Sequence, residues 1–386
     1  MESFLDIHQV SFNKTGEELC GDQVRVIKTP AATSIILSDG LGSGVKANIL
    51  ATLTAEILAT MLRESIDLHE IIDTVIRTLP VDKTHHIAYA TFSILTLSQT
   101  DDTFQTINFD NPSPFFIQNK RIEKLAFHQE KILGKSIVTA RGTLGMGGFI
   151  GLASDGVLHA GPGSKLNKDW DWEKIAAHLE GLFSTRIFTA HGVVNDVMAV
   201  TNKLYDYKPG DDATFVGVLR RGRSKLMVFT GPPLDSGFDY VPVERFLKFK
   251  GHKVICGGTT ANIVASFLKT KVETDPSSLT DSYPAIGRLP GIDLVTEGII
   301  TLAAAVDALE SCDGQLEKLK PAHNGVYLLA SELLQADAID FMVGQSVNPA
   351  YYNPLLPKNT SIRRYLIDRL AELLIRYHKD VQIEYY

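Results

Sequence analysis

The chain has 386 residues, of which 44% are hydrophobic and 22% are charged, a composition typical of globular proteins. Its 45 acidic and 38 basic side chains give a formal net charge of -7 at pH 7. This charge disfavours a nucleic-acid partner, because a phosphate backbone is itself negative. The composition also excludes disorder or a fibrous repeat as the main organisation, and the length predicts two or three domains.

The amino-terminal segment MESFLDIHQV is acidic and lacks the basic start and apolar core of an export signal. No uninterrupted apolar run approaches the ~18 residues of a membrane helix, and even GIITLAAAVDAL is broken by Asp307. The widely spaced Cys20, Cys256 and Cys312 contain no CxxC pair, which argues against a disulfide framework and a zinc site. We therefore expect a cytoplasmic protein without a membrane partner.

The first half of the chain is dominated by predicted strands. In chain order these are TSIILSD, IAYATFSILTL, TFQTINF, PFFIQ, FIGLASD and TFVGVL, which are rich in β-branched and aromatic residues and are separated by turn residues. A helix is predicted between the first two, from an apolar residue at every fourth position. The residues of this stripe are Val45, Ile49, Leu53, Ile57 and Met61. Two more helices are expected over residues 68–79 and 172–183.

A basic turn, RRGRSK, follows TFVGVL and predicts a domain boundary near residue 222. Beyond it strands, glycine turns and helices alternate: KLMVFTGPP, then KVICGG with TTANIVASFLKT, then GIDLVTE with GIITLAAAVDALES. This alternation predicts an α/β domain with a mostly parallel sheet. A helix near 326–334, the strand AIDFMVG, the loop QSVNPAYYNPLLP and a helix over 362–377 complete the chain. The predicted domains are residues 1–221 and 225–386.

Acidic residues in the first half stand where predicted strands meet turns, each close to a glycine. They are Asp22 in CGDQV, Asp39 in LSDGLGSG, Asp155 in ASDGV, and Asp211 with Asp212 in PGDDATF. Carboxylates and backbone carbonyls are the ligands of hard cations, so the set indicates Mg²⁺ or Mn²⁺. No histidine pair or cysteine cluster favours zinc or iron. Taken singly, each motif is more often a simple turn.

The order of these motifs is specific: GD, then DGxGxG before an amphipathic helix, then SDGV, then GDDAT. It resembles the metal-dependent protein serine/threonine phosphatases of the type 2C superfamily, and within it the SpoIIE-like bacterial branch, over about residues 1–221. The resemblance implies an α+β fold of two antiparallel sheets flanked by helices, with two Mn²⁺ or Mg²⁺ ions. The metal ligands that it implies are Asp22, Asp39, the carbonyl of Gly40, Asp155, Asp211 and the neighbouring Asp212.

The same resemblance implies hydrolysis of phosphoserine or phosphothreonine on a partner protein, such as an antagonist of an anti-sigma factor. Catalysis would act through the metals held by Asp39 and Asp155 and would need no protein nucleophile; the general acid is unassigned. Two alternatives stay open. One is an inactive signalling scaffold, against which the intact acidic set argues because clustered carboxylates are costly without cations. The other is a small-molecule phosphatase. A homo-oligomer is compatible with all three.

The second half contains a separate candidate ligand site. In VICGGTTANIV a strand leads through two glycines and two threonines into a helix, an arrangement that suits a phosphate or carboxylate, although a capped helix after a tight turn is the alternative. The polar, aromatic loop QSVNPAYYNPLLP is typical of binding loops. The candidate residues are Gly257, Gly258, Thr259, Thr260, Asn348 and Asn353. We expect this domain to sense a ligand or to dock the substrate.

Overall fold

The computed structural model describes residues 3–64, 66–78, 90–132, 134–160, 170–185, 189–232, 240–346 and 362–386. The chain forms two compact units, Met1–Gly222 and Arg223–Tyr386, and each has its own sheets and its own hydrophobic core.

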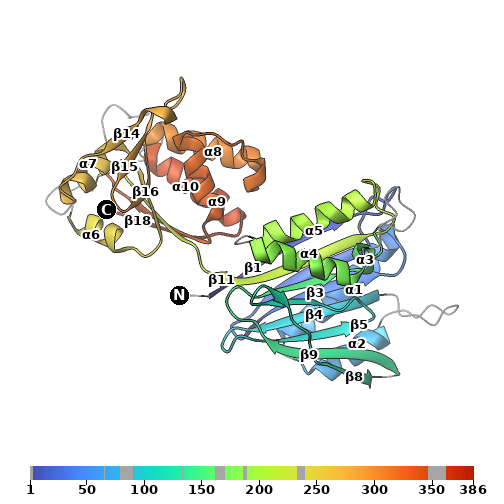
Figure 1. The fold of residues 1–386 in the computed structure, drawn as a ribbon. Helices are drawn as coiled ribbons and strands as arrows, with labels where there is room; N and C mark the ends of the chain where they lie inside the picture. The colour runs from blue at the N-terminus through green and yellow to red at the C-terminus, as the bar shows by residue number, and fades with distance from the viewer. Residues whose placement is uncertain are drawn as a thin grey trace. The chain divides into compact units, whose positions relative to one another are not determined.

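The first unit stacks two antiparallel sheets (Figure 1). One has five strands in the order β1-β11-β10-β6-β7, and the other has six in the order β2-β3-β4-β5-β9-β8. The strand bounds are β1 Ser3–Phe12, β2 Asp22–Lys28, β3 Ala32–Gly40, β4 Ala90–Ser98, β5 Thr103–Phe109, β6 Phe115–Gln118, β7 Arg121–Ile122, β8 Phe127–Ile132, β9 Lys135–Thr143, β10 Phe149–Ala153 and β11 Ala213–Gly222.

Helices cover both outer faces of this pair of sheets. They are α1 Gly44–Arg63, α2 Leu68–Thr78, the short α3 Asp155–Leu158, α4 Trp172–Thr185 and α5 Ala190–Leu204. Helices α4 and α5 pack on the five-stranded sheet through Leu179 and Val197 (Figure 1), and α1 and α2 pack on the six-stranded sheet through Leu58 and Ile72. A separate cluster of buried hydrophobic residues lies between the two sheets and contains Leu37. The expected α+β sandwich is confirmed.

The predicted apolar stripe of α1 is wrong for most of its length. Val45, Ile49 and Leu53 are 56%, 59% and 43% exposed. The buried face contains instead the small residues Ala47, Ala51, Ala55 and Ala59, together with Leu50, Thr54 and Leu58. Alanine lets the helix axis approach the sheet closely, and the larger side chains are left outside.

By length and composition alone, α1 is also the one helix within the described ranges that could cross a membrane. Its alanine face is packed on the six-stranded sheet, as is usual for the core helix of a soluble domain.

The second unit has one seven-stranded sheet in the order β14-β15-β16-β13-β12-β17-β18. The five strands from β16 to β18 are parallel, and β14 and β15 add an antiparallel edge. The expected mostly parallel sheet is therefore present. The strand bounds are β12 Lys225–Thr230, β13 His252–Cys256, β14 Glu273–Asp275, β15 Ile286–Leu289, β16 Ile292–Thr296, β17 Ala338–Val343 and β18 Asp380–Tyr385.

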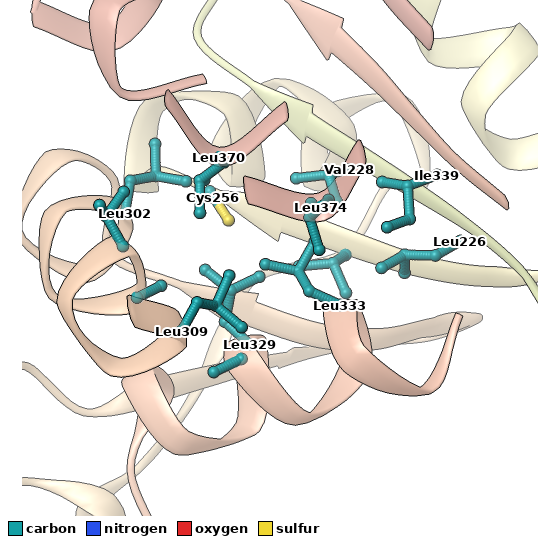
Figure 2. Packing of buried hydrophobic residues seen from close by; sticks show 14 of the residues in the cluster. Leu226, Val228, Cys256, Leu302, Leu309, Leu329, Leu333, Ile339, Leu370 and Leu374 are labelled. Atoms are coloured by element: carbon teal, nitrogen blue, oxygen red, sulfur yellow. The ribbon is translucent and has the colours of Figure 1, made fainter. Parts of the chain in front are cut away.

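Helices lie on both faces of this sheet. Their bounds are α6 Tyr240–Lys248, α7 Gly258–Phe267, α8 Ile299–Cys312, α9 Gly325–Gln335 and α10 Ile362–Arg376, with short 3-10 turns at Pro276–Ser278 and Leu316–Lys318. Helices α6 and α7 pack on one face through Phe246 and Val264. Helices α8, α9 and α10 pack on the other, where Leu309, Leu333 and Leu370 cluster with Val228 of β12 (Figure 2).

Candidate functional site

Two of the predicted acidic residues meet at one edge of the six-stranded sheet. Asp22 is the first residue of β2 and Asp39 lies near the end of β3. Because β2 and β3 are antiparallel, the start of one strand lies beside the end of the other, and Asp22 is paired directly with Asp39. Direct pairing places two side chains on the same face of the sheet, about 5 Å apart at Cβ.

The five-stranded sheet supplies the remaining carboxylates from a second antiparallel pair. Asp155 begins α3 shortly after β10, and Asp211 and Asp212 immediately precede β11. Strands β10 and β11 are hydrogen-bonded neighbours, so the end of one and the beginning of the other coincide. In each sheet, antiparallel pairing therefore brings the acidic residues to the same end of two neighbouring strands.

Ser154 joins the two sheets at this point. Its backbone N–H donates to the carbonyl of Thr214 over 2.9 Å, and its Oγ accepts from the Thr214 N–H over 2.8 Å. The same hydroxyl donates to Oδ2 of Asp22 over 2.7 Å. Since Ser154 is completely buried, this bridge ties Asp22 of one sheet to the β10–β11 pair of the other.

Glycines beside the carboxylates allow backbone segments to approach closely. A Cβ on Gly156 would lie 2.0 Å from the carbonyl oxygen of Asp212, and one on Gly40 would lie 2.1 Å from the carbonyl oxygen of Ala47 in α1. A Cβ on Gly21 would lie 2.7 Å from Oδ2 of Asp212. Larger residues at these positions would force the acidic segments apart.

Burial and mutual repulsion make Asp39 a weak acid. Burial raises its pKa to about 9, and the carboxylates of Asp22, Asp155 and Asp211 add to this rise. The pKa of Asp211 is raised as well, first by burial and then by Asp155. The carboxylate contributions to these shifts show that negative charge is brought together here, and at Asp211 the positive charge of Lys14 only partly opposes it.

The pKa of Asp22 is raised as well, but hydrogen bonds partly oppose the rise. Burial raises its pKa to about 7, hydrogen bonds from Ser154 and Thr214 oppose that rise, and the neighbouring Asp212 and Asp155 reinforce it. Its second oxygen, Oδ1, is buried without a hydrogen-bond partner in the described part of the chain, and so is Oδ2 of Asp212. Orphaned carboxylate oxygens in an uncompensated acidic cluster fit the oxygen-only ligand preference of a hard divalent cation.

The side chains do not form a ready-made coordination set. Within the described ranges, no group of three or more His, Cys, Asp or Glu side chains is arranged to hold a metal ion. Asp212 directs Oδ1 to the N–H of Lys14 over 3.0 Å, and Asp211 directs Oδ1 to the N–H of Asp212 over 3.0 Å. The fit with a cation is therefore one of residue type and charge, and the carboxylates would have to turn toward it.

Two residues near the cluster were not predicted from the sequence. Ser154 stands inside the ASDGV motif, where its place before Asp155 was an available signal. Tyr205 has no such signal: it follows α5, and its hydroxyl donates to the carbonyl of Gly156 over 2.7 Å. Burial and then the carboxylates of Asp211 and Asp155 raise the pKa of this tyrosine.

The candidate residues of the second unit are only partly brought together. Helix α7 starts at Gly258 and its N-cap is Gly257, without a side-chain cap. Thr259 and Thr260 therefore lie inside the first turn and are not caps, and Thr260 is buried. Asn348 and Asn353 lie outside the described residues.

A family model described as Stage II sporulation protein E (SpoIIE) matches residues 29–221, half of the chain. A comparison with curated proteins found no match. Among solved structures, the PP2C phosphatase domain of SpoIIE from Bacillus subtilis, with a fragment of its regulatory domain, is 18% identical with a TM-score of 0.49. That match covers 57% of this chain and 63% of the other, so this chain spans less than two thirds of that structure.

Two further structures are similar to part of this chain. The RsbU and RsbW domains of a protein from Mycobacterium tuberculosis are 18% identical with a TM-score of 0.45, over 56% of this chain and 60% of the other. RsbX in complex with magnesium is 19% identical with a TM-score of 0.42, over 56% of this chain and 95% of the other.

The fold and the site together define a helix-flanked sandwich of two antiparallel sheets, with a cluster of aspartates where strands of both sheets end. The chain belongs to the SpoIIE family, and all matched residues lie in the first unit.

Proposed function

We propose that the first unit is a metal-dependent protein serine/threonine phosphatase. The observation that supports this most directly is the partly buried acidic cluster, in which the pKa of Asp39 rises to about 9 through burial and neighbouring carboxylates. A cluster of this kind is costly to maintain unless a cation neutralises it. Membership of the SpoIIE family, whose matched region contains Asp39, Asp155, Asp211 and Asp212, agrees with that role.

The residues proposed to hold two Mn²⁺ or Mg²⁺ ions are Asp22, Asp39, the carbonyl of Gly40, Asp155, Asp211 and Asp212. When bound, such ions supply positive charge for a phosphate dianion and lower the pKa of the attacking water. Asp39 and Asp155 would act through the ions, and the interaction of Asp39 with Asp22, Asp155 and Asp211 supports a central role for it among the proposed ligands.

The chain's own residues would prepare this centre. Ser154 fixes the rotamer of Asp22 by donating to Oδ2 and leaves Oδ1 available. The backbone N–H of Lys14 holds Asp212 in the same way through Oδ1 and leaves Oδ2 available. A ligand held by one oxygen needs little further ordering when the other oxygen binds a cation.

The proposed substrate is phosphoserine or phosphothreonine on a partner protein, such as an antagonist of an anti-sigma factor, in the cytoplasm. We also propose that the two compact units act as separate domains. Residues 1–221 would carry the hydrolysis, and residues 225–386 would sense a ligand or dock the substrate.

The test is hydrolysis of an aryl phosphate and a phosphoserine peptide by the full chain with Mn²⁺, with Mg²⁺ and with EDTA. Activity is expected only with metal. Asp39→Asn should lower kcat/KM at least about a thousandfold, since the charge stabilisation that a metal gives is worth several kcal/mol. Asp73→Asn is the matched control, because Asp73 forms an i,i+4 pair with the exposed Arg77 on α2, outside the cluster.

Equal activity of Asp39→Asn and wild type would contradict the site. No turnover with any metal by a folded protein would favour an inactive scaffold. Hydrolysis of small phosphate esters at a much higher kcat/KM than the peptide would favour a small-molecule phosphatase.

A further inference from the structure

The sheet of the second unit reverses its direction of winding at one place. From β12, the middle one of the five parallel strands, the chain passes through α6 to β13, and from there through α7 toward β16, with both helices on one face. It then returns to β17 on the other side of β12 and continues through α10, on the opposite face, to β18. The next described helices after β12 and β17, α6 and α10, therefore lie on opposite faces, and open α/β sheets bind ligands at the carboxyl ends of such a strand pair.

The ends of β12 and β17 are locked together at this switch point. The N–H of Gly344 donates to the carbonyl of Thr230 over 2.8 Å, and the N–H of Ser346 donates to the carbonyl of Pro232 over 3.2 Å. A Cβ on Gly344 would lie 2.2 Å from the carbonyl oxygen of Gly231. This close approach requires glycine and gives the switch point a rigid floor.

Arg363, in the first turn of α10, lies directly on this floor. Its Nη1 donates to the carbonyls of Gly344 and Ser346 over 2.9 and 3.1 Å. The guanidinium lies where a side chain at Gly231 would be, since a Cβ there would come within 2.4 Å of Nη1. Gly231 also has a φ of +80°, so glycine is favoured at this position on two grounds.

The charge of Arg363 is not compensated by the described residues. Only burial affects the pKa of this partly buried side chain, and burial lowers it. Within the described part of the chain Arg363 forms no ion pair, and its hydrogen bonds to the carbonyls of Gly344 and Ser346 use only Nη1. By contrast, every other arginine of α10 in the first three turns pairs with a carboxylate: Arg364 with Asp368, and Arg369 with Glu310 and Glu372.

We propose that Arg363 anchors a binding site for the phosphate group of a small molecule at the β12–β17 switch point. A guanidinium fixed by one nitrogen keeps its remaining N–H groups for a bidentate contact with phosphate oxygens. The rigid backbone beneath it means that little conformational entropy is lost on binding.

This site differs from the glycine-threonine turn at the start of α7. Glu297 accepts from the N–H of Ile300 over 2.9 Å and contributes to the raised pKa of Cys256, so its carboxylate lies near the ends of β13 and β16. A negative group there opposes an anion at Gly257–Thr260. At Arg363 no described carboxylate does so.

The test is calorimetric titration of the full chain with inorganic phosphate, AMP and ADP in a buffer containing EDTA. The chelator prevents metal-dependent binding of phosphate in the first unit. We expect one binding site per chain that is weakened at least about tenfold by Arg363→Gln, the loss of a charge-assisted hydrogen bond. Tighter binding of ADP or AMP than of phosphate identifies a nucleotide as the source of the group, and equal binding identifies phosphate itself.

Arg376→Gln is the matched control, because Arg376 is exposed at the end of the same helix and its substitution removes the same charge. It should leave the affinity unchanged within about twofold. Arg363→Lys keeps the positive charge but loses the planar guanidinium that can bind two phosphate oxygens at once, so it should bind phosphate more weakly than wild type. This variant tests the site even if Arg363→Gln fails to fold. Absence of binding by the folded wild type, or equal affinity in wild type and Arg363→Lys, would overturn the proposal.

Discussion

Within the described residues, the two units contain charges of opposite sign that form no ion pair. In the first unit, aspartates from two sheets lie together, and burial and neighbouring carboxylates raise the pKa of Asp39 to about 9. In the second unit, Arg363 lies against backbone carbonyls and no described carboxylate pairs with it. Other charged groups of the described residues form exposed ion pairs, such as Arg245 with Glu384. The comparison teaches that the charges not satisfied by the fold are the ones to examine for a charged ligand: a cation in the first unit and an anion in the second.

The largest expected effect concerns the cation side of this comparison. Mn²⁺ at a hundred times its dissociation constant should stabilise the first unit by about 2.7 kcal/mol. In Asp39→Asn this stabilisation should be largely lost, because one of the proposed ligands would lose its charge. Without metal, the variant should unfold at the same temperature as wild type or higher, since it removes a buried acid from a repelling cluster. Calorimetric melting with Mn²⁺ and with EDTA measures both effects.

An equal metal-induced shift of the melting temperature in wild type and Asp39→Asn would remove Asp39 from the proposed ligands. Asp73→Asn serves again as the control for an exposed carboxylate in the same unit.

The second prediction compares the close backbone contacts of the two sites. A Cβ would lie 2.0 Å from a carbonyl oxygen at Gly156 and 2.2 Å from one at Gly344. Alanine at either position should destabilise its own unit by about 1–3 kcal/mol through overpacking. Gly156→Ala should also weaken metal-dependent stabilisation, and Gly344→Ala should weaken phosphate binding. Urea unfolding followed by ligand titration measures these effects.

Gly181→Ala is the control for this pair. Gly181 is in α4, and a Cβ there would meet no atom of the described residues within 4 Å. Because alanine is a better helix former, this substitution should stabilise by about 0.5–1 kcal/mol. If Gly156→Ala behaved like Gly181→Ala, the tight packing of Gly156 against Asp212 would be disproved.

The third prediction concerns the bridge between the two sheets. Ser154→Ala removes the hydrogen bond to Oδ2 of Asp22 and the acceptor of the Thr214 N–H. We expect a loss of about 1–2 kcal/mol of unfolding free energy. The pKa of Asp22 should rise further, because the hydrogen bond from Ser154 lowers it in the wild type. Ser98→Ala, which changes an exposed hydroxyl contact, should change the unfolding free energy by less than about 0.5 kcal/mol.

The smallest expected effect concerns Asp275, a carboxylate whose oxygens accept hydrogen bonds, in contrast to the aspartates of the first unit with an unpaired oxygen. Hydrogen bonds from Ser277 and Arg288 lower the pKa of Asp275 to about 2. A carboxylate with a lowered folded pKa contributes stability above its unfolded value of about 3.9, and this contribution is lost as the pH falls toward 2. Asp275→Asn should therefore differ from wild type in urea midpoint at pH 6 and differ less at pH 2. A difference that is constant with pH would contradict the shift.

Much of the fold could be predicted from local sequence patterns, and the failures have physical causes. β3, β4, β5, β10 and β11 are apolar enough to be recognised, whereas β8, FHQEKI, is an exposed edge strand without a hydrophobic pattern. The helix α5 was missed because AHGVVNDVMAVTNKL is rich in valine, asparagine and threonine, which have low helix propensity. Its packing on the five-stranded sheet stabilises it instead.

The α1 stripe shows where a periodic pattern is insufficient. Both the face with Val45 and Ile49 and the face with Ala47 and Ala51 have helical spacing. The close contact of Gly40 with the carbonyl of Ala47 requires a small face toward the sheet. That contact joins separate elements, so it is not visible in the periodicity of α1 itself.

The sequence by itself determined the order of the elements, the alternation that marks the parallel sheet, and the acidic motifs at strand ends, because each depends on residues that are close along the chain. Only the tertiary structure decided which distant groups meet. It paired Asp22 with Asp39 across β2 and β3, joined both sheets through Ser154, and placed Arg363 on the contact between Gly231 and Gly344. These juxtapositions depend on strand register and on close backbone approach, which long-range packing sets and local composition does not encode.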